Sequence, residues 1–457
     1  MKKYEAIIIG SGQAGSPLWD GLTERGWTVA LVEKDHLGGT CINYGCTPTK
    51  TMVASAQVTH YARNAARWGV RCGTVSVDLP GVVARKDAIV KRFREGKENQ
   101  AAERKNLHLY RGQARFGAPH TVTVGDELLE GERIFINTGA RPALPPIDGL
   151  ETVDYLTNAS LLQLEELPEH LLVLGGGYIG LEFGQMFRRF GSRVTIVHKD
   201  GEILGREDTD VAAELRKTLE GEGLRFVLNA STTRVAGGNG QVTLSLDLPT
   251  GSQTVSGSHL LVATGRRPNT DDLDLGKAGV EIDQHGYIKV NGRLETNVPG
   301  IWALGDVKGG PAFTHISYDD YQIVYGNLIE GKRLTTEGRI VPYAVFTDPQ
   351  LGRVGMSERQ ARATGRTLKV GKIPMTWVAR AIERDETAGL MKLVVDAGTD
   401  QILGAAILAT EGGELIHVLE ALMLARAPYT VLRGSIYIHP TLAEGFSSLM
   451  DEVKAME

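Results

Sequence analysis

The chain has 457 residues, of which 42% are apolar and 23% charged, enough for about three globular domains. Its formal net charge of -5 argues against a nucleic-acid partner, because binding phosphates needs a clustered basic surface. No apolar run approaches the ~20 residues that cross a bilayer, and the first residues carry no signal-peptide pattern. We therefore expect a cytoplasmic protein with no membrane partner.

The chain opens with a strand, a glycine turn, a helix and a second strand. The predicted strands cover residues 4–9 and 27–33, and the predicted helix covers residues 16–25. The turn reads Gly10-x-Gly12-x-x-Gly15, and Glu33 ends the second strand. Such a turn lets the backbone and a helix N-terminus approach a pyrophosphate, while the carboxylate binds a ribose diol. The pattern predicts a dinucleotide-binding unit.

A second unit of the same kind follows later in the chain. A strand at residues 171–174 leads into Gly175-x-Gly177-x-x-Gly180, a helix, and a strand at residues 193–197. Two such units predict two dinucleotide-binding domains.

The second unit has no acid where Glu33 stands in the first. His198 and Lys199 end its strand, and Arg206 follows. Basic groups at this place favour the extra phosphate of NADP over the ribose hydroxyl of NAD. We therefore predict NADPH, with NADH as the alternative. The competing interpretation is that these side chains are ordinary solvated surface groups.

The remaining segments differ in their predicted secondary structure. Residues 52–105 are predicted to be helical, residues 107–135 to form short strands, and residues 224–262 to form a hairpin or meander. From residue 341 the pattern is mixed, with predicted strands at 390–395 and 402–408 and a helix at 414–425. The predicted fold class is α/β, with two Rossmann-like domains and a C-terminal α+β domain.

Two of the three cysteines lie close together. Cys41 and Cys46 are separated by four residues, while Cys72 has no neighbouring cysteine and receives no role. An odd, small number argues against a secreted disulfide framework, and no second pair completes a zinc site. Two inert buried thiols are the competing interpretation. The position after the first glycine turn, among Gly, Thr and Lys residues, favours redox chemistry.

At this point the sequence closely resembles the pyridine nucleotide–disulfide oxidoreductase family, which includes lipoamide dehydrogenase, glutathione reductase and mercuric reductase. The resemblance covers essentially the whole chain. It rests on motifs at residues 10–15, 39–50, 138–139, 175–180, 263–266, 304–306 and 439–444. Several independent motifs in the family's order make coincidence implausible.

The resemblance implies FAD in the first domain and a nicotinamide nucleotide in the second. The residues that it assigns to the cofactors, beyond those named above, are Gly39, Thr40, Lys50, Thr138, Gly139, Gly265, Arg266, Gly305 and Asp306. Asp306 matches the acid near the flavin ribityl or pyrophosphate region. Lys50 and Glu182 match a buried ion pair beside the flavin N5, and Tyr178 matches the aromatic residue that covers the flavin.

The resemblance also implies a redox relay. Electrons would pass from NAD(P)H to the flavin, then to a Cys41–Cys46 disulfide, then to a substrate. Cys46 would be the thiolate against the flavin, and Cys41 the thiol that meets the substrate. His439 matches the family's acid–base and Glu444 the carboxylate that orients it, in a Cys–His–carboxylate arrangement. We expect a base and a helix N-terminus to lower the thiol pKa, because exchange needs a thiolate.

The same resemblance implies a homodimer, because the family's His–Glu pair reaches the cysteines of the other subunit. The domains are predicted at residues 1–148 (FAD, first part), 149–264 (NAD(P)), 265–336 (return to the FAD domain) and 337–457 (interface).

The substrate is less determined. No cysteine follows Cys72, so the C-terminal cysteine pair of the well-known mercuric reductases is missing. The stretches 135–140, 313–320 and 346–350 nonetheless resemble the mercuric-reductase-like branch, including the flavoprotein of reactive-chlorine resistance. There Cys41 and Cys46 would bind or reduce a soft metal ion as substrate. His315 is a candidate for a residue near that ion, and the favoured interpretation is a surface or cofactor-contacting histidine. The alternatives are a dihydrolipoamide dehydrogenase or other disulfide reductase, and a redox-sensing flavin-binding protein with incidental turnover.

Overall fold

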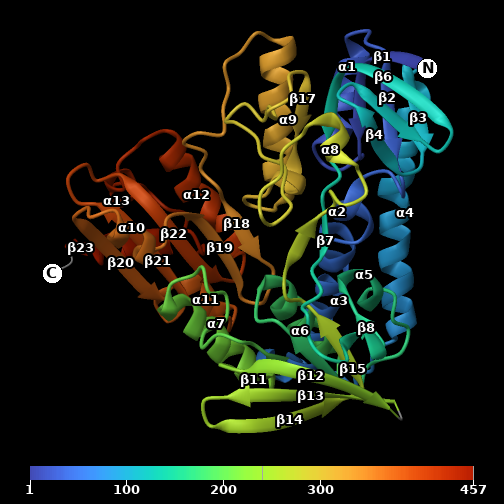
Figure 1. The fold of residues 1–457 in the computed structure, drawn as a ribbon. Coiled ribbons are helices and arrows are strands. Elements are labelled where there is room, and N and C mark those ends of the chain that lie inside the picture. The colour runs from blue at the N-terminus through green and yellow to red at the C-terminus, as the bar shows by residue number, and fades with distance from the viewer. Residues whose placement is uncertain (239, 456–457) are drawn as a thin grey trace. The chain divides into compact units, whose positions relative to one another are not determined.

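The computed structural model describes residues 1–238 and 240–455, which fall into two compact units (Figure 1). Unit 1 consists of Met1–Thr51, Gly81–Ala143 and Gly265–Arg339. Unit 2 consists of Met52–Pro80, Leu144–Thr264 and Ile340–Glu457, of which the last two residues lie outside the described part. The chain thus passes between the units several times.

Unit 1 is built on a seven-stranded sheet of order β3-β2-β1-β6-β5-β4, with β17 paired to β6. The strands are β1 (Lys2–Ile9), β2 (Val29–Glu33), β3 (Leu107–Arg111), β4 (Ala114–Ala118), β5 (Thr121–Val124), β6 (Glu127–Ile136) and β17 (Ile301–Ala303). The strands β3, β2, β1, β6 and β17 run parallel. A two-stranded ribbon joins β7 (Ala140–Pro142) to β16 (Arg266–Pro268).

Strand β1 is apolar on both faces because both faces are covered. Ile7 and Ile9 belong to one core, and Ala6 and Ile8 to another. The helices of this unit are α1 (Gly15–Glu24), α2 (Gly39–Asn43), α3 (Cys46–Asn64, continuing into unit 2), α4 (Leu79–Glu103), α8 (Leu275–Ala278) and α9 (Thr314–Ile329). Side chains of α1 and α9 pack against Ala6 and Ile8. The parallel sheet therefore presents its strand ends, and the turns after them, to ligands.

Unit 2 contains a parallel five-stranded sheet of order β11-β10-β9-β15-β8. Its strands are β8 (Tyr155–Leu156), β9 (His170–Leu174), β10 (Arg193–Val197), β11 (Arg225–Val227) and β15 (His259–Val262), with helices α5 (Asn158–Leu161), α6 (Tyr178–Phe190) and α7 (Thr209–Gly221). The predicted meander is the antiparallel ribbon β12 (Ser231–Gly238), β13 (Gln241–Leu248) and β14 (Gly251–Gly257), visible in green-yellow in Figure 1.

The C-terminal part of unit 2 is an antiparallel sheet of order β18-β19-β22-β21-β20-β23 with helices packed on it. Its strands are β18 (Tyr343–Val345), β19 (Gln350–Gly355), β20 (Leu368–Pro374), β21 (Leu390–Asp396), β22 (Ile402–Ala409) and β23 (Lys454–Ala455). Its helices are α10 (Glu358–Ala363), α11 (Ala379–Glu383), α12 (Gly412–Leu424), α13 (Thr430–Arg433) and α14 (Gly445–Asp451). Together the two units confirm the predicted α/β class.

Within the described residues, no helix has the length and apolar character needed to cross a membrane.

A buried lysine joins α7 and α10 to this C-terminal sheet. The Lys392 ammonium lies 2.9 to 3.3 Å from the carboxylates of Asp208, Asp210 and Glu358. Burial raises the pKa of Asp210, but hydrogen bonds from Lys392 and Lys372 outweigh it and hold that pKa below its ordinary value. Burial likewise raises the pKa of Glu358, but hydrogen bonds from Lys392 and Arg362 outweigh it and lower that pKa. The cluster is therefore stabilising only while its carboxylates are ionised.

We expect Lys392→Met to lower the free energy of unfolding by about 3–5 kcal/mol at pH 7, because it leaves several carboxylates without their buried cation. Carboxylates with lowered pKa values stabilise the fold above their unfolded pKa, about 4, and lose that contribution as the pH falls through the folded value. The urea midpoint of the wild type should therefore decrease below about pH 4, and that of the variant should decrease less. Equal pH profiles for the two proteins would contradict this account.

Candidate active site

The first glycine loop (residues 10–15) follows β1 and opens α1. Gly10 has φ +99°, and a Cβ there would lie 2.3 Å from the carbonyl oxygen of Asn137. A Cβ on Gly15 would lie 2.2 Å from the carbonyl oxygen of Gly10. Side chains would therefore force the turn open. The close turn directs the N-terminus of α1, with its N–H groups, at the space beyond the sheet.

Glu33 ends β2 beside this loop. Its carboxylate accepts hydrogen bonds from the backbone N–H of Ser11 at 2.9 Å and the Ser11 hydroxyl at 2.7 Å. The other carboxylate oxygen accepts from the N–H of Asp35 at 3.0 Å. Glu33 therefore lies where its acceptor oxygens border the turn, as a ribose-binding acid should.

The remaining residues predicted to bind FAD lie on connected turns of unit 1. The ribbon β7–β16 brings the segment of Thr138 and Gly139 beside that of Gly265 and Arg266, and the Thr138 hydroxyl donates to Asn269 O. Burial raises the pKa of Asp306, and Arg266, 3.6 Å away, opposes that increase. Helix N–H donors for phosphates and carboxylates for hydroxyl groups are the donor set that FAD needs, so these residues fit the cofactor.

The second glycine loop (residues 175–180) repeats the first. A Cβ on Gly175 would lie 2.4 Å from Ala263 O, whereas one on Gly177 would meet no heavy atom within 4 Å. The space beside Gly177 is therefore open to a nucleotide's phosphates. Tyr178 begins α6 directly after it and is 36% exposed.

His198 occupies the place of Glu33 in the second loop, but it is not a cation there. The N–H of Gly176 donates to His198 Nδ1 at 3.2 Å, and burial lowers the pKa of the imidazole. A ring nitrogen that accepts a hydrogen bond carries no proton. The positive charge that the sequence predicted here therefore comes from Lys199 and Arg206, which are both exposed.

The cysteine segment (residues 38–50) is fastened to the first glycine loop. The N–H of Gly38 donates to the Ser11 hydroxyl at 3.1 Å, and the Gln13 amide donates to Gly38 O at 3.1 Å. A Cβ on Gly39 would lie 2.7 Å from Gly12 Cα, so the two backbones touch. Thr40 and Cys41 follow on α2, and Lys50 lies on α3. The dithiol segment is thus held against the first glycine loop.

Cys41 and Cys46 are both thiols in this structure, and they hydrogen bond to each other. The Cys46 sulfur lies 3.3 Å from the Thr314 hydroxyl, at the start of α9. The hydrogen bond with Cys46, and then burial, raise the pKa of Cys41. The expectation of a lowered pKa is therefore wrong for Cys41 in the isolated chain. The physical reason is that the Cys41 thiol hydrogen bonds to the Cys46 sulfur and is partly buried, and both features disfavour a charge on Cys41.

His439 and Glu444 form the predicted pair in unit 2. Both carboxylate oxygens lie 3.1 Å from His439 Nδ1, and Thr441 N donates to one of them at 2.9 Å. That N–H, and then His439, outweigh a small effect of burial and lower the pKa of Glu444. The contact leaves Nε2 as the nitrogen for proton exchange. The His439 side chain is 73% exposed, and the neighbouring Ile436 and Ile438 are 100% and 79% exposed.

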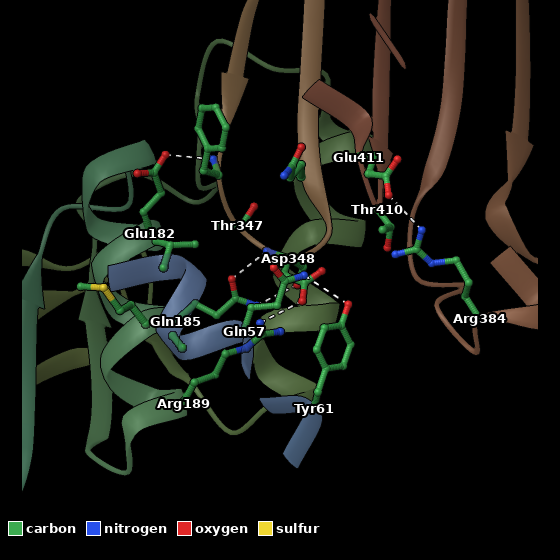
Figure 2. A pocket seen from close by; sticks show the side chains of 15 residues that line it. Gln57, Tyr61, Glu182, Gln185, Arg189, Thr347, Asp348, Arg384, Thr410 and Glu411 are labelled. Atoms are coloured by element: carbon green, nitrogen blue, oxygen red, sulfur yellow. Dashed lines mark hydrogen bonds and ion pairs between the residues drawn. The ribbon is translucent and has the colours of Figure 1, made fainter. Parts of the chain in front are cut away.

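Glu182 and Lys50 lie in different units, so their pairing stays a prediction. Glu182 is 3% exposed on α6 and accepts from Phe346 N at 2.9 Å. Figure 2 shows it at one end of a cavity of about 320 Å³ within unit 2. One turn further along α6, Gln185 binds the backbone N–H and C=O of Asp348, while Arg189 binds its carboxylate. These contacts fix the turn between β18 and β19 beside Glu182.

Several contributing residues were missed from the sequence. Asn137 links the first glycine loop to the turn before Asp306. Asp320 is fully buried and accepts from Gly305 N at 2.8 Å. Thr314 contacts Cys46. Ordinary polar residues in short loops carry no pattern that would identify them.

His315 stacks on Phe313 and is exposed, and no cluster of three metal-binding side chains occurs among the described residues.

Comparisons with known proteins agree with this architecture. Residues 4–320 match the family described as pyridine nucleotide-disulphide oxidoreductase, and residues 341–450 match its dimerisation domain. The chain is 40% identical over 462 residues to the probable pyridine nucleotide-disulfide oxidoreductase RclA of Escherichia coli, covering 99% of this chain and 100% of that protein.

Other relatives carry different activities in their names. A mercuric reductase of Lysinibacillus sphaericus is 35% identical, over 97% of this chain and 81% of that protein. A dihydrolipoyl dehydrogenase of Thermus scotoductus is 37% identical, over 100% of this chain and 98% of that protein.

A solved Cu(II) complex of the HOCl-induced flavoprotein disulfide reductase RclA superposes with a TM-score of 0.90 at 39% identity, covering 98% of this chain and 100% of that one. The fold class and the resemblance inferred from the sequence are both confirmed. The chain belongs to the pyridine nucleotide-disulfide oxidoreductase family of FAD-dependent oxidoreductases.

Proposed function

We propose that this enzyme passes electrons from NADPH through FAD to the Cys41–Cys46 pair, and from there to a metal ion such as Hg(II) or Cu(II) or to another thiol-reactive oxidant. The observation that carries the proposal is the cysteine segment, whose Gly38 and Gly39 lie directly against Ser11 and Gly12 of the first glycine loop. This contact between the dithiol segment and a predicted cofactor loop supports redox exchange over simple packing.

FAD, when bound, would supply an electron pair drawn from the nicotinamide nucleotide. The chain's own residues receive that pair: a Cys41–Cys46 disulfide takes two electrons and one proton and becomes a thiolate at Cys46 and a thiol at Cys41. Glu33, Asp306 and the glycine loop orient the cofactor.

The His439–Glu444 pair of a second copy exchanges the proton at Cys41, so the active form is a homodimer. Exposure of Ile436 and Ile438 beside His439 supports this, because exposed apolar clusters mark interfaces.

We infer the substrate class from chemistry and relatives together. Thiolates prefer soft ions, and the relatives include a mercuric reductase and a flavoprotein disulfide reductase solved as a Cu(II) complex. The second candidate is reduction or oxidation of a disulfide or dithiol, favoured by the His439–Glu444 contact, because disulfide exchange needs a proton donor. An exchanging dithiol also fits a reducing, cytoplasmic setting.

The proposal also includes the division of the chain into FAD, NAD(P), FAD and interface domains, with boundaries after residues 148, 264 and 336.

The nucleotide preference rests on Lys199 and Arg206. We expect the double variant Lys199→Ala/Arg206→Ala to raise the KM for NADPH on the order of 10-fold, because two exposed ion pairs with the 2′-phosphate are each worth up to about 1 kcal/mol. The kcat and the KM for NADH should stay unchanged. Steady-state kinetics with both nucleotides test this, with Lys217→Ala on α7 as a control. Equal changes for the two nucleotides would show that these side chains do not read the phosphate.

The central test is an anaerobic titration of the purified enzyme with NADPH and with NADH, followed by visible absorbance. A long-wavelength band between the Cys46 thiolate and the flavin should grow in, and faster with NADPH. Bleaching of the flavin without such a band would mean that the cysteines are not coupled to it, and the relay would be abandoned. Lipoamide, oxidised glutathione, Hg(II) and Cu(II) should then be compared as acceptors.

A further inference from the structure

The side chain of Asn137 lies between two turns of unit 1 that are far apart in sequence. Asn137 follows β6, is 7% exposed, and its own N–H donates to Ile9 O at 2.8 Å. Its amide oxygen accepts from Gly15 N at 2.9 Å, and its amide nitrogen donates to Leu304 O at 2.9 Å. Both ends of one buried amide are thus used, each by a different turn.

Two glycines, one in each turn, lie so close to Asn137 that the turns enclose its side chain. A Cβ on Gly12 would lie 2.9 Å from Asn137 Oδ1, and a Cβ on Gly305 would lie 2.8 Å from Asn137 Nδ2. The amide therefore fills the space that those glycines leave. Asp320 holds the far side of the second turn through Gly305 N and is itself paired with Lys308 and Arg339. These contacts hold the second turn in place. A change in the Asn137 side chain should therefore alter the separation between the two turns.

We infer that Asn137 is a positioning residue for FAD, which sets the separation between the pyrophosphate-binding loop (residues 10–15) and the turn that carries Asp306. An amide suits this place because it accepts at one end and donates at the other. Alanine would leave the Gly15 N–H and the Leu304 carbonyl without partners, and a buried unsatisfied polar group costs more than the bond contributed. The inference rests on the assignment of both turns to FAD in the proposed function.

The test measures flavin release from the purified holoenzyme, as free-flavin fluorescence at a temperature well below unfolding. Asn137→Ala should increase the dissociation constant for FAD on the order of 10-fold or more, because two buried hydrogen bonds are lost. Asn106→Ala is the matched control. Its side-chain amide also joins two backbone positions, by donating to the carbonyls of Thr23 and Trp27, but it lies away from the cofactor turns. Asn137→Ser replaces the alanine variant if that protein is not recovered folded.

A double-mutant cycle with Asp306→Ala separates positioning from general loosening. If Asn137 acts through the turn of Asp306, the two changes together weaken FAD binding by less than the product of the separate factors. Equal flavin release from the Asn137 and Asn106 variants, or a fully multiplicative cycle, would overturn the inference. A wild-type protein that binds no FAD would instead overturn the proposed function, so the two failures are distinguishable.

Discussion

Replacing Cys41 with serine is expected to stop electron delivery to every acceptor while NADPH still reduces the bound cofactor. A serine hydroxyl neither ionises at neutral pH nor forms a disulfide, so the exchange step has no nucleophile. The loss in kcat should be on the order of 10³-fold or more, as when one member of a catalytic unit is removed. Stopped-flow absorbance measures cofactor reduction, and acceptor turnover is measured in parallel.

Cys46→Ser distinguishes the roles of the two thiols. This variant should lose both acceptor turnover and the long-wavelength absorbance band, whereas Cys41→Ser should retain the band because the Cys46 thiolate remains. Cys72→Ser is the matched control, since Cys72 is exposed and lies outside the pair. If the Cys41 variant lost the band and the Cys46 variant kept it, the assignment of the two sulfurs would be reversed.

Replacing His439 with glutamine should lower turnover of disulfide acceptors by about 10²- to 10⁴-fold, the range of general acid–base catalysis. Glutamine keeps a polar side chain but cannot carry a proton between Cys41 and the leaving thiol. Since the ring is largely exposed and its Nδ1 contacts the nearby Glu444 carboxylate, the fold should be unaffected. Single-turnover rates with lipoamide or oxidised glutathione measure the effect.

The same variant separates the two substrate classes, because a metal ion requires only that Cys41 lose its proton, whereas a disulfide also has a leaving thiol that must be protonated. If Cu(II) or Hg(II) is the acceptor, His439→Gln should change its turnover by less than about 10-fold. Glu444→Gln should produce a smaller loss with disulfides than His439→Gln, since it removes only orientation and charge. An unchanged rate with every acceptor would remove the pair from the mechanism.

The sequence predicts the strands better than the segments between them. The strand expected at residues 193–197 is β10 with the same bounds, because a short apolar run after a glycine turn has few alternatives. The helical region expected at 52–105 is in fact interrupted: α3 ends at Asn64, α4 begins at Leu79, and residues 70–78 form no helix. Gly69, with φ +74°, ends the preceding turn in a conformation that continues no right-handed helix.

The candidate site was also predicted only in part. Glycines, cysteines and the His439–Glu444 spacing are visible in the sequence because backbone or chemistry demands those residue types. Charge states are not visible. His198 reads as a cation, yet the fold places Nδ1 against Gly176 N and keeps the ring neutral. Asn137 could not be found either, because its role exists only once Gly15 and Leu304 have been brought together.

The order in which the ribosome produces unit 1 has a consequence for synthesis. Strand β6 ends at Ile136, but its parallel neighbour β17 begins only at Ile301, after most of the nucleotide-binding part of unit 2. At ordinary translation rates the interval is roughly 10–30 s. During it the last residues of β6, Ile134 to Ile136, lack the partner strand β17 that they have in the finished sheet, and an unpaired strand edge is prone to join other chains. Truncated products that stop within residues 144–264 should therefore aggregate, and in a cell their yield should depend on chaperones.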